Sequence, residues 1–120
     1  MPSYHSNKNV MVKRISLVWK RPELSREEFR RLWLGEHVSC AKRLRGLREY
    51  VIDFVTDGLP EAPSGIATLR FDSREALEAA FADPRLKEDL LRTRATFAEA
   101  VEVMIVEEEV VVSAPLLGRA

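Results

Sequence analysis

Residues 25–46 limit the fold of this chain most, because they predict a long amphipathic helix with marked ends. Ser25 and Glu28 form a capping-box pattern, in which each side chain can satisfy a free backbone N–H group at a helix start. Gly46 suits the left-handed conformation that ends a helix. At about 100° per residue, the apolar side chains of this helix fall on one arc that must face a core. They are Phe29, Leu32, Trp33, Cys40 and Leu44.

Two ionisable residues, Glu36 and His37, fall within or beside this apolar arc. A buried ionisable group needs either a hydrogen-bond partner or a function. We expect His37 to be a hydrogen-bonded core residue or a member of a functional site, and the helix pattern alone leaves both open. Glu36 is expected to reach solvent at the edge of the arc, and Gly35 weakens the helix beside it.

The rest of the chain alternates between runs typical of strands and runs typical of helices. Strands rich in β-branched and aromatic residues are predicted over residues 10–20, 47–56, 65–71 and 101–112. A second helical region starts at Asp72 and Ser73, restarts at Asp83 and Pro84, and frays toward Phe97. The order βαββαβ predicts an α+β, ferredoxin-like fold with a four-stranded antiparallel sheet. We expect one domain over residues 10–112, with tails at residues 1–9 and 113–120.

The predicted strands are apolar on both faces, whereas a sheet covered on one face should alternate apolar and polar residues. In the first strand, the apolar residues fall on both faces: Ile15, Leu17 and Trp19 on one and Val18 on the other. Two helices cover only one face of such a sheet. We therefore expect a homodimer in which two sheets meet back to back, forming a dimeric α+β barrel.

Composition excludes several classes of function. Nineteen basic residues balance nineteen acidic ones, which argues against nucleic acid as the main partner. Cys40 is the only cysteine, so an internal disulfide is impossible and a reducing compartment is favoured. No apolar run reaches the roughly 18 residues of a membrane span, and the polar opening lacks the apolar segment of a signal peptide. We expect a cytoplasmic protein that acts on no membrane.

His37 and Tyr50 are the predicted catalytic residues. The helix and the strand that follows it run antiparallel from Gly46, which places His37 roughly 12 Å back along the helix and Tyr50 roughly 13 Å along the strand. The two side chains can then share one crevice. A histidine moves protons near neutral pH, and a tyrosine hydroxyl can orient a substrate or donate to a developing oxyanion. The alternative is a structural hydrogen bond between the two rings.

Other candidate residues carry weaker signals. Trp19, Trp33 and Phe54 are predicted to bind substrate, with a purely structural role in the core as the alternative. Arg48 and Arg70 are candidates for binding a substrate carboxylate, although paired surface charges are the favoured interpretation. Two histidines and one cysteine without ligand spacing predict no metal site. No phosphate-binding loop or nucleophile motif is present, so we expect no cofactor.

The chain resembles the EthD family over residues 11–112. The resemblance rests on the W-x-x-x-H spacing of Trp33 and His37, on the G-L-x-x-Y pattern that ends at Tyr50, and on the segments GIATLRFDSREALEAAFADP and VMIVEEEVVV. It implies a dimeric α+β barrel. Relatives of this fold include a methylmuconolactone methylisomerase, polyketide-tailoring decarboxylases and dehydratases, and cofactor-free monooxygenases. The methylisomerase resemblance implies that His37 and Tyr50 are site residues, while Val38-Ser39-Cys40 departs from the small residue and proline common in the family.

These observations lead to three functional hypotheses. The first is a cofactor-independent enzyme, of isomerase, lyase or monooxygenase type, whose substrate is a small cyclic or aromatic compound. His37 would be its general acid or base and Tyr50 would orient the substrate. The second is a non-catalytic protein that binds a small molecule in the same crevice. The third makes His37 an axial haem ligand.

Overall fold

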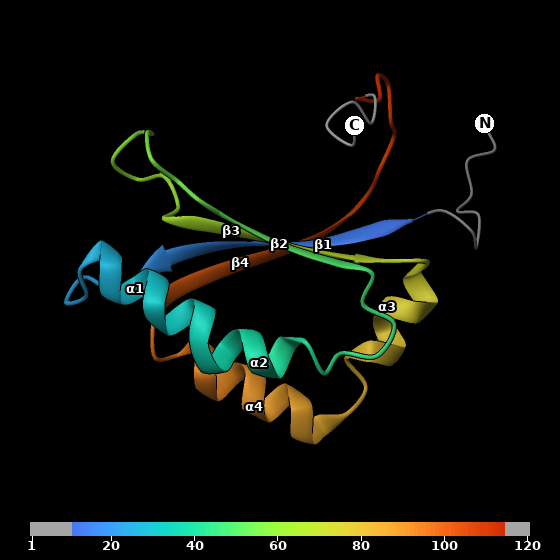
Figure 1. The fold of residues 1–120 in the computed structure, drawn as a ribbon, viewed down its shortest axis with the longest axis horizontal. Coiled ribbons are helices and arrows are strands. Elements are labelled where there is room, and N and C mark those ends of the chain that lie inside the picture. Colours follow the sequence, from blue (N-terminus) through green and yellow to red (C-terminus); the bar gives the residue numbers. More distant parts are fainter. Residues whose placement is uncertain (1–10, 115–120) are drawn as a thin grey trace, which may run out of the picture.

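The computed structural model describes residues 11–114 and confirms the predicted βαββαβ order (Figure 1). The predicted N-terminal tail, residues 1–9, lies outside the described range, as does most of the predicted C-terminal tail. Four strands pair antiparallel in the order β2-β3-β1-β4. Their bounds are Val12–Lys20 for β1, Glu49–Phe54 for β2, Gly65–Phe71 for β3 and Ala98–Glu107 for β4.

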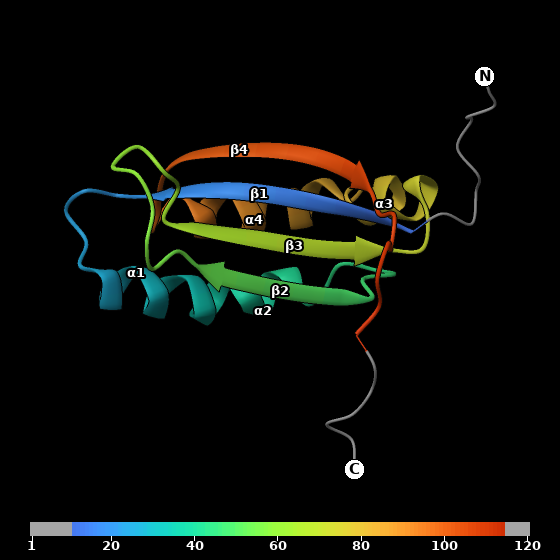
Figure 2. The same cartoon turned by 90° about the horizontal axis from the view of Figure 1, so that it is seen from above.

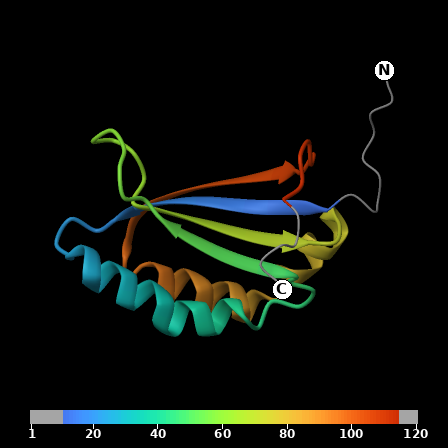
Figure 3. The same ribbon diagram turned by 45° about the horizontal axis from the view of Figure 1, so that its top comes forward.

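All the described helices pack on one face of this sheet (Figures 1 and 3). They comprise α1 (Arg26–Leu32), the π-helical turn η1 (Trp33–His37), α2 (Val38–Ala41), α3 (Arg74–Ala80) and α4 (Pro84–Arg94). Seen from the opposite side, the strands lie in front of the helices, and no described helix or strand covers them (Figure 2). None of the helices in residues 11–114 is long and apolar enough to cross a membrane.

The helix starts follow their sequence signals, and the first helix ends earlier than predicted. The capping box of Ser25 and Glu28 is present, with the Ser25 hydroxyl accepting from the Glu28 N–H at 3.1 Å. The prediction of one helix to Gly46 is wrong, because regular helix ends at Ala41 and is interrupted at Gly35 (φ −88°, ψ −115°). Glycine adopts such non-helical angles more readily than other residues. The wider π-helical turn accommodates this interruption of the helix.

The strand predictions hold best in the middle of the sheet. β3 has the predicted bounds, whereas β2 is shorter than the predicted 47–56. β4 starts earlier than predicted, because Lys20 pairs with Ala98 beyond a bulge, and it ends at Glu107, opposite the first residue of β1. Val111 and Val112 therefore lie outside the strand, each 87% exposed. An edge strand needs hydrogen-bond partners on the neighbouring strand. Because β1 begins at Val12, it offers no partner to the residues that follow Glu107.

The core lies between the helices and the sheet and is rich in aromatic rings. Trp33 stacks on Phe97 with ring centroids 5.1 Å apart, and Phe29 meets Trp33 edge to face at 5.4 Å. Cys40 is buried in this core, as the helix pattern predicts. The cluster fixes η1 and the end of α4 against the sheet, and these two elements form one side of the cavity described next.

Candidate functional site

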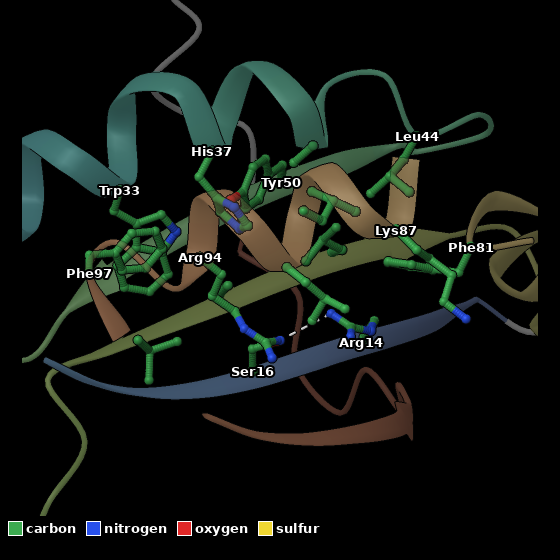
Figure 4. Close-up of a pocket in the computed structure, with 16 residues that line it drawn as sticks. Arg14, Ser16, Trp33, His37, Leu44, Tyr50, Phe81, Lys87, Arg94 and Phe97 are labelled. Carbon is green, nitrogen blue, oxygen red and sulfur yellow. Dashed lines mark hydrogen bonds between the residues drawn. The ribbon is translucent and has the colours of Figure 1, made fainter. Parts of the chain in front are cut away.

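A cavity of about 130 Å³ lies between the helices and the sheet, bounded by η1, α4 and the first three strands (Figure 4). Its floor is hollow because Ser16 of β1 and Ala67 of β3 are direct neighbours in the strand register and both are small. An apolar protein cavity of on the order of 150 Å³ can hold benzene. This cavity therefore has room for a ligand with a single ring.

His37 lines the cavity from the last position of η1 and is oriented by α4. Its Nδ1 lies 2.7 Å from the Thr93 hydroxyl oxygen, which in turn lies 2.9 Å from the carbonyl oxygen of Asp89. A hydroxyl has one proton, and the helix carbonyl can only accept it. We therefore assign, from this hydrogen-bond network, a proton to His37 Nδ1 and a free lone pair to Nε2.

The surroundings of His37 keep its imidazole neutral. Burial lowers the pKa of His37 from 6.5 to about 4, and the nearby positive charges of Arg94 and Arg14 act in the same direction. A protonated imidazole would have to leave water and lie beside two cations. At neutral pH His37 can therefore accept a proton or a hydrogen bond at Nε2.

Tyr50 lines the same cavity from β2. Burial raises the pKa of the Tyr50 hydroxyl above its ordinary value, and contact with the Trp33 side chain offsets this in part. The phenol is therefore protonated at neutral pH and can donate a hydrogen bond. No hydrogen bond joins Tyr50 to His37 in residues 11–114, so each has a polar group to offer a ligand.

Two half-buried arginines also line the cavity, and sequence reasoning missed both as site residues. Arg14 extends from β1, where it donates to the Ser16 hydroxyl at 3.3 Å and stacks 4.5 Å from the centre of the Phe81 ring. Arg94 reaches the cavity from the last turn of α4 (Figure 4). Neither forms an ion pair within the described part of the chain. No local signal marks Arg14, because the first strand is apolar on both faces and its sequence does not show which face the helices cover.

The predicted substrate-binding residues are divided among different places. Trp33 lines the cavity. Trp19 lies outside it, because its odd position in β1 points to the uncovered face, where its indole N–H donates to the Glu61 carbonyl at 3.0 Å. Phe54 borders a separate hollow near α1 and packs under the Arg30 guanidinium, 4.5 Å from the centre of its ring. The structure therefore brings Trp33 together with His37 but not Trp19 or Phe54.

The remaining charged candidates are paired on the surface. Glu36 is exposed and forms an ion pair with Arg92 at 3.3 Å, as expected for a residue at the edge of the arc. Arg48 pairs with Asp72 at 2.7 Å. Arg70 pairs with Glu49 and Glu108. The favoured interpretation of Arg48 and Arg70, paired surface charges, is thus confirmed.

The described residues contain no cluster of metal ligands, and the cavity beside His37 is too small for haem. Within residues 11–114, no three His, Cys, Asp or Glu side chains come together as a metal site requires. Haem has four pyrrole rings around its iron, whereas the cavity beside His37, at about 130 Å³, has room for one ring.

Comparison with known proteins agrees with the fold and the resemblance. The family model described as the EthD domain matches residues 21–100. The chain belongs to the EthD family. A solved EthD family protein from Bacillus halodurans C-125 is 23% identical, over 82% of this chain and 99% of its own, with a TM-score of 0.66.

Two further solved structures share the fold at lower identity. A dimeric ferredoxin-like protein of unknown function from Thermobifida fusca YX is 10% identical, over 88% of this chain and 100% of its own, with a TM-score of 0.66. SnoaB from Streptomyces nogalater, described as a cofactor-independent oxygenase, is 11% identical, over 83% of this chain and 94% of its own, with a TM-score of 0.60. None of the curated proteins matches this sequence. These likenesses establish the ferredoxin-like fold of the family.

Proposed function

We propose that this EthD protein is a cofactor-independent enzyme that removes a proton from a small cyclic or aromatic compound bound beside His37. The observation that carries the proposal is the position of the imidazole, which Thr93 orients at 2.7 Å and which leaves Nε2 free in a ring-sized cavity. A free lone pair on an oriented, partly dehydrated imidazole is what a general base requires. The fold-level likeness to a cofactor-independent oxygenase supports the same class of chemistry.

The proposed reaction begins when Nε2 of His37 takes a proton from a carbon or hydroxyl of the ring. The electron pair left behind moves toward a ring oxygen, which the protonated Tyr50 hydroxyl stabilises by donating a hydrogen bond. Isomerisation and reaction with oxygen proceed from an enolate of this kind, whereas decarboxylation of a ring acid produces such an enolate, which the same Tyr50 hydrogen bond would stabilise. General-base help contributes about 10²–10⁴-fold to such a step.

Hydrogen–deuterium exchange tests this proposal whatever the final product of the reaction is. Small cyclic ketones, lactones and phenols are incubated with the protein in D₂O, and loss of ring protons is followed by NMR. We expect catalysed exchange to fall at least about 100-fold in His37→Gln and about tenfold in Tyr50→Phe. Arg74→Gln, which breaks an exposed ion pair on α3, is the matched control and should exchange at the wild-type rate. Wild-type exchange in His37→Gln would exclude His37 as the base.

A second candidate function is ligand binding without catalysis. It is favoured by the partner of His37, which is a neutral hydroxyl, because a carboxylate partner would stabilise the imidazolium formed during proton transfer and a hydroxyl does so less. Compounds that occupy the cavity with no exchange of any ring proton would support this alternative.

We also infer that the protein works as a homodimer in which the uncovered sheet faces pack together. Apolar side chains on that face are only half-buried in one copy, including Ile15 and Leu17 of β1 and the 38% exposed Met104 of β4. Surface of this kind is usually buried by a partner. Solved relatives from Thermobifida fusca and Bacteroides fragilis are described as dimeric. A second copy supplies a matching apolar face by symmetry.

A further inference from the structure

We propose that the ligand of the His37 cavity carries a carboxylate, bound jointly by Arg14 and Arg94. The inference rests on the proposed function only in placing the ligand in this cavity, and it requires no particular reaction. It names a substrate class: a single-ring carboxylic acid in its ionised form.

The first observation is the one-sided charge of the cavity. Arg14, Lys87 and Arg94 line it, and no Asp or Glu does so among residues 11–114. Lys87 is exposed, but Arg14 and Arg94 are half-buried and have no carboxylate partner within that range. A partly buried cation without a counter-charge lowers stability. The protein retains two of them in one hollow, which is the arrangement of an anion site.

The second observation is the geometry of the two guanidinium groups. Arg14 extends from β1 and Arg94 from α4, and both side chains reach into the same part of the cavity (Figure 4). Burial, and to a lesser extent the positive charge of Arg94, lower the pKa of Arg14. Both remain protonated at neutral pH, since an arginine loses its proton only under strongly basic conditions. A planar carboxylate matches the fork of a guanidinium with two parallel hydrogen bonds.

The third observation is that Arg14 is held in place before any ligand arrives. The Phe81 ring lies 4.5 Å under its guanidinium, and the Ser16 hydroxyl accepts one of its N–H groups. The other N–H groups remain available. A side chain already fixed by packing loses little entropy on binding, which favours recognition of a small ligand.

The position of the arginines links binding to the base. Arg94 and Lys87 from α4, Arg14 from β1 and Tyr50 from β2 are the charged or titratable groups that line the cavity with His37. The charges of Arg94 and Arg14 contribute to the low pKa of His37. A bound carboxylate neutralises part of that charge and so removes one cause of the low pKa of His37. Binding therefore makes His37 more basic.

Binding calorimetry with matched acid and amide pairs tests the proposal. The probes are benzoate, phenylacetate and cyclohexanecarboxylate, each compared with its neutral amide. We expect at least one acid to bind about tenfold or more tightly than its amide, since a hydrogen bond to a charged group is worth about that factor or more. The advantage of that acid should disappear in Arg14→Gln and in Arg94→Gln.

Controls are available on the same elements. Arg92→Gln lies on α4 and removes an exposed arginine that pairs with Glu36 and Asp89 outside the cavity, and Lys13→Gln lies next to Arg14 on the other face of β1. Both should bind the acid as the wild type does. Arg94→Lys keeps the charge but loses the fork, so it tests the geometry if either glutamine variant fails to fold.

The proposal is overturned if no acid binds more tightly than its amide, or if both arginine variants retain the full preference. These outcomes are independent of the proposed reaction. If acids bind through Arg14 and Arg94 but no ring proton exchanges, the proposed enzymatic function is wrong and the proposed anion site is supported. If ring protons of neutral compounds exchange and acids bind no more tightly than amides, the enzymatic function is supported and the anion site is wrong. His37→Gln should still bind the acid, because its side chain contributes no charge to the site.

Discussion

The contact between His37 and Thr93 decides what the histidine can do. Thr93 is 2% exposed, and its hydroxyl donates to a carbonyl of its own helix, so it can only accept from the imidazole. This arrangement puts the free lone pair on the other ring nitrogen. A buried threonine that bonds its own helix is common, but one that also accepts a histidine N–H sets a tautomer.

The first prediction concerns stability against pH. The folded-state pKa of His37 is about 4, below its ordinary 6.5. Between these values the unfolded chain binds a proton at this position and the folded protein does not. Stability should therefore fall as pH decreases from about 6.5 to about 4, by on the order of 3 kcal/mol in total, and change no further from this source at lower pH.

Urea unfolding of the wild type and of His37→Gln at several pH values measures this contribution. The difference between the two free energies of unfolding should shift in favour of His37→Gln as pH falls through that window. A difference independent of pH would show that the imidazole titrates alike in the folded and unfolded chains.

The second prediction concerns Thr93. Thr93→Val keeps the shape of the side chain but leaves the His37 Nδ1–H without an acceptor, and an unsatisfied buried group costs about 1–3 kcal/mol. Thr93→Ser retains the hydroxyl and should lose less. Thermal unfolding of the two variants gives the comparison, and equal losses would mean that the hydroxyl does not matter to His37.

At the scale of elements, the cavity depends on the close approach of η1 to β3. A Cβ atom added at Gly65 would lie 2.5 Å from the Trp33 ring, a distance that real Cβ contacts essentially never show. Glycine at the start of β3 therefore allows the π-helical turn to seat Trp33 against the sheet. The same seating places His37, four residues further on, over the cavity.

The third prediction follows from this contact. Gly65→Ala should destabilise the protein by about 1–3 kcal/mol, because the ring and the strand must move apart. In the Trp33→Phe background the same substitution should cost less, since phenylalanine lacks the outer ring atoms that clash. A double-mutant cycle by urea unfolding measures the coupling. Additive losses would mean that Trp33 does not depend on Gly65.

Sequence reasoning predicted the elements that carry local signals and missed features that depend on distant contacts. The capping box at Ser25 and the left-handed Gly46 (φ 80°) are visible in a few neighbouring residues, and both were predicted. The break at Gly35 was not, because glycine is tolerated in many helices and its effect depends on packing. β4 was placed too late, because its ends are set by pairing with β1 and not by its own valines.

The candidate site was predictable only in part: His37, Tyr50 and Trp33 line the cavity as predicted, whereas Trp19 and Phe54 do not. His37 and Tyr50 were proposed from their heights along adjacent elements, and the structure places both in the lining of one cavity. Their catalytic roles stay a prediction. Arg14 and Arg94 look like two of many surface arginines in the sequence, and only the fold brings them to the same hollow. Nothing in the sequence marks Thr93 as a site residue, because a threonine within a helix does not by itself indicate a functional role.

For the whole molecule, the open side of the sheet is the feature that a single copy leaves unexplained. Helices cover one face of the sheet (Figure 2). The other face presents apolar residues beside an ion-pair network of Arg70 with Glu49 and Glu108. An apolar centre with a charged border is typical of a protein interface. The proposed dimer buries this surface.

The fourth prediction tests that interface with two neighbours on β4. Met104 faces the uncovered side beside Ile15, and Val103 points to the opposite side beside Ser16, with similar exposed fractions of 38% and 41%. Met104→Lys should shift the protein from twice its chain mass of 13.7 kDa to that mass in sedimentation equilibrium, whereas Val103→Lys should not. A wild-type protein that sediments as a monomer at all concentrations would contradict the dimer.

An NMR titration of the His37 ring nitrogens in the free protein measures the protonation state of this imidazole directly. His5 is the other histidine in the sequence, and His5→Gln assigns the two signals. We predict a pKa of about 4 for His37, with the proton on Nδ1 and a free lone pair on Nε2 at neutral pH. A pKa near 6.5, or a proton on Nε2 at neutral pH, would contradict it.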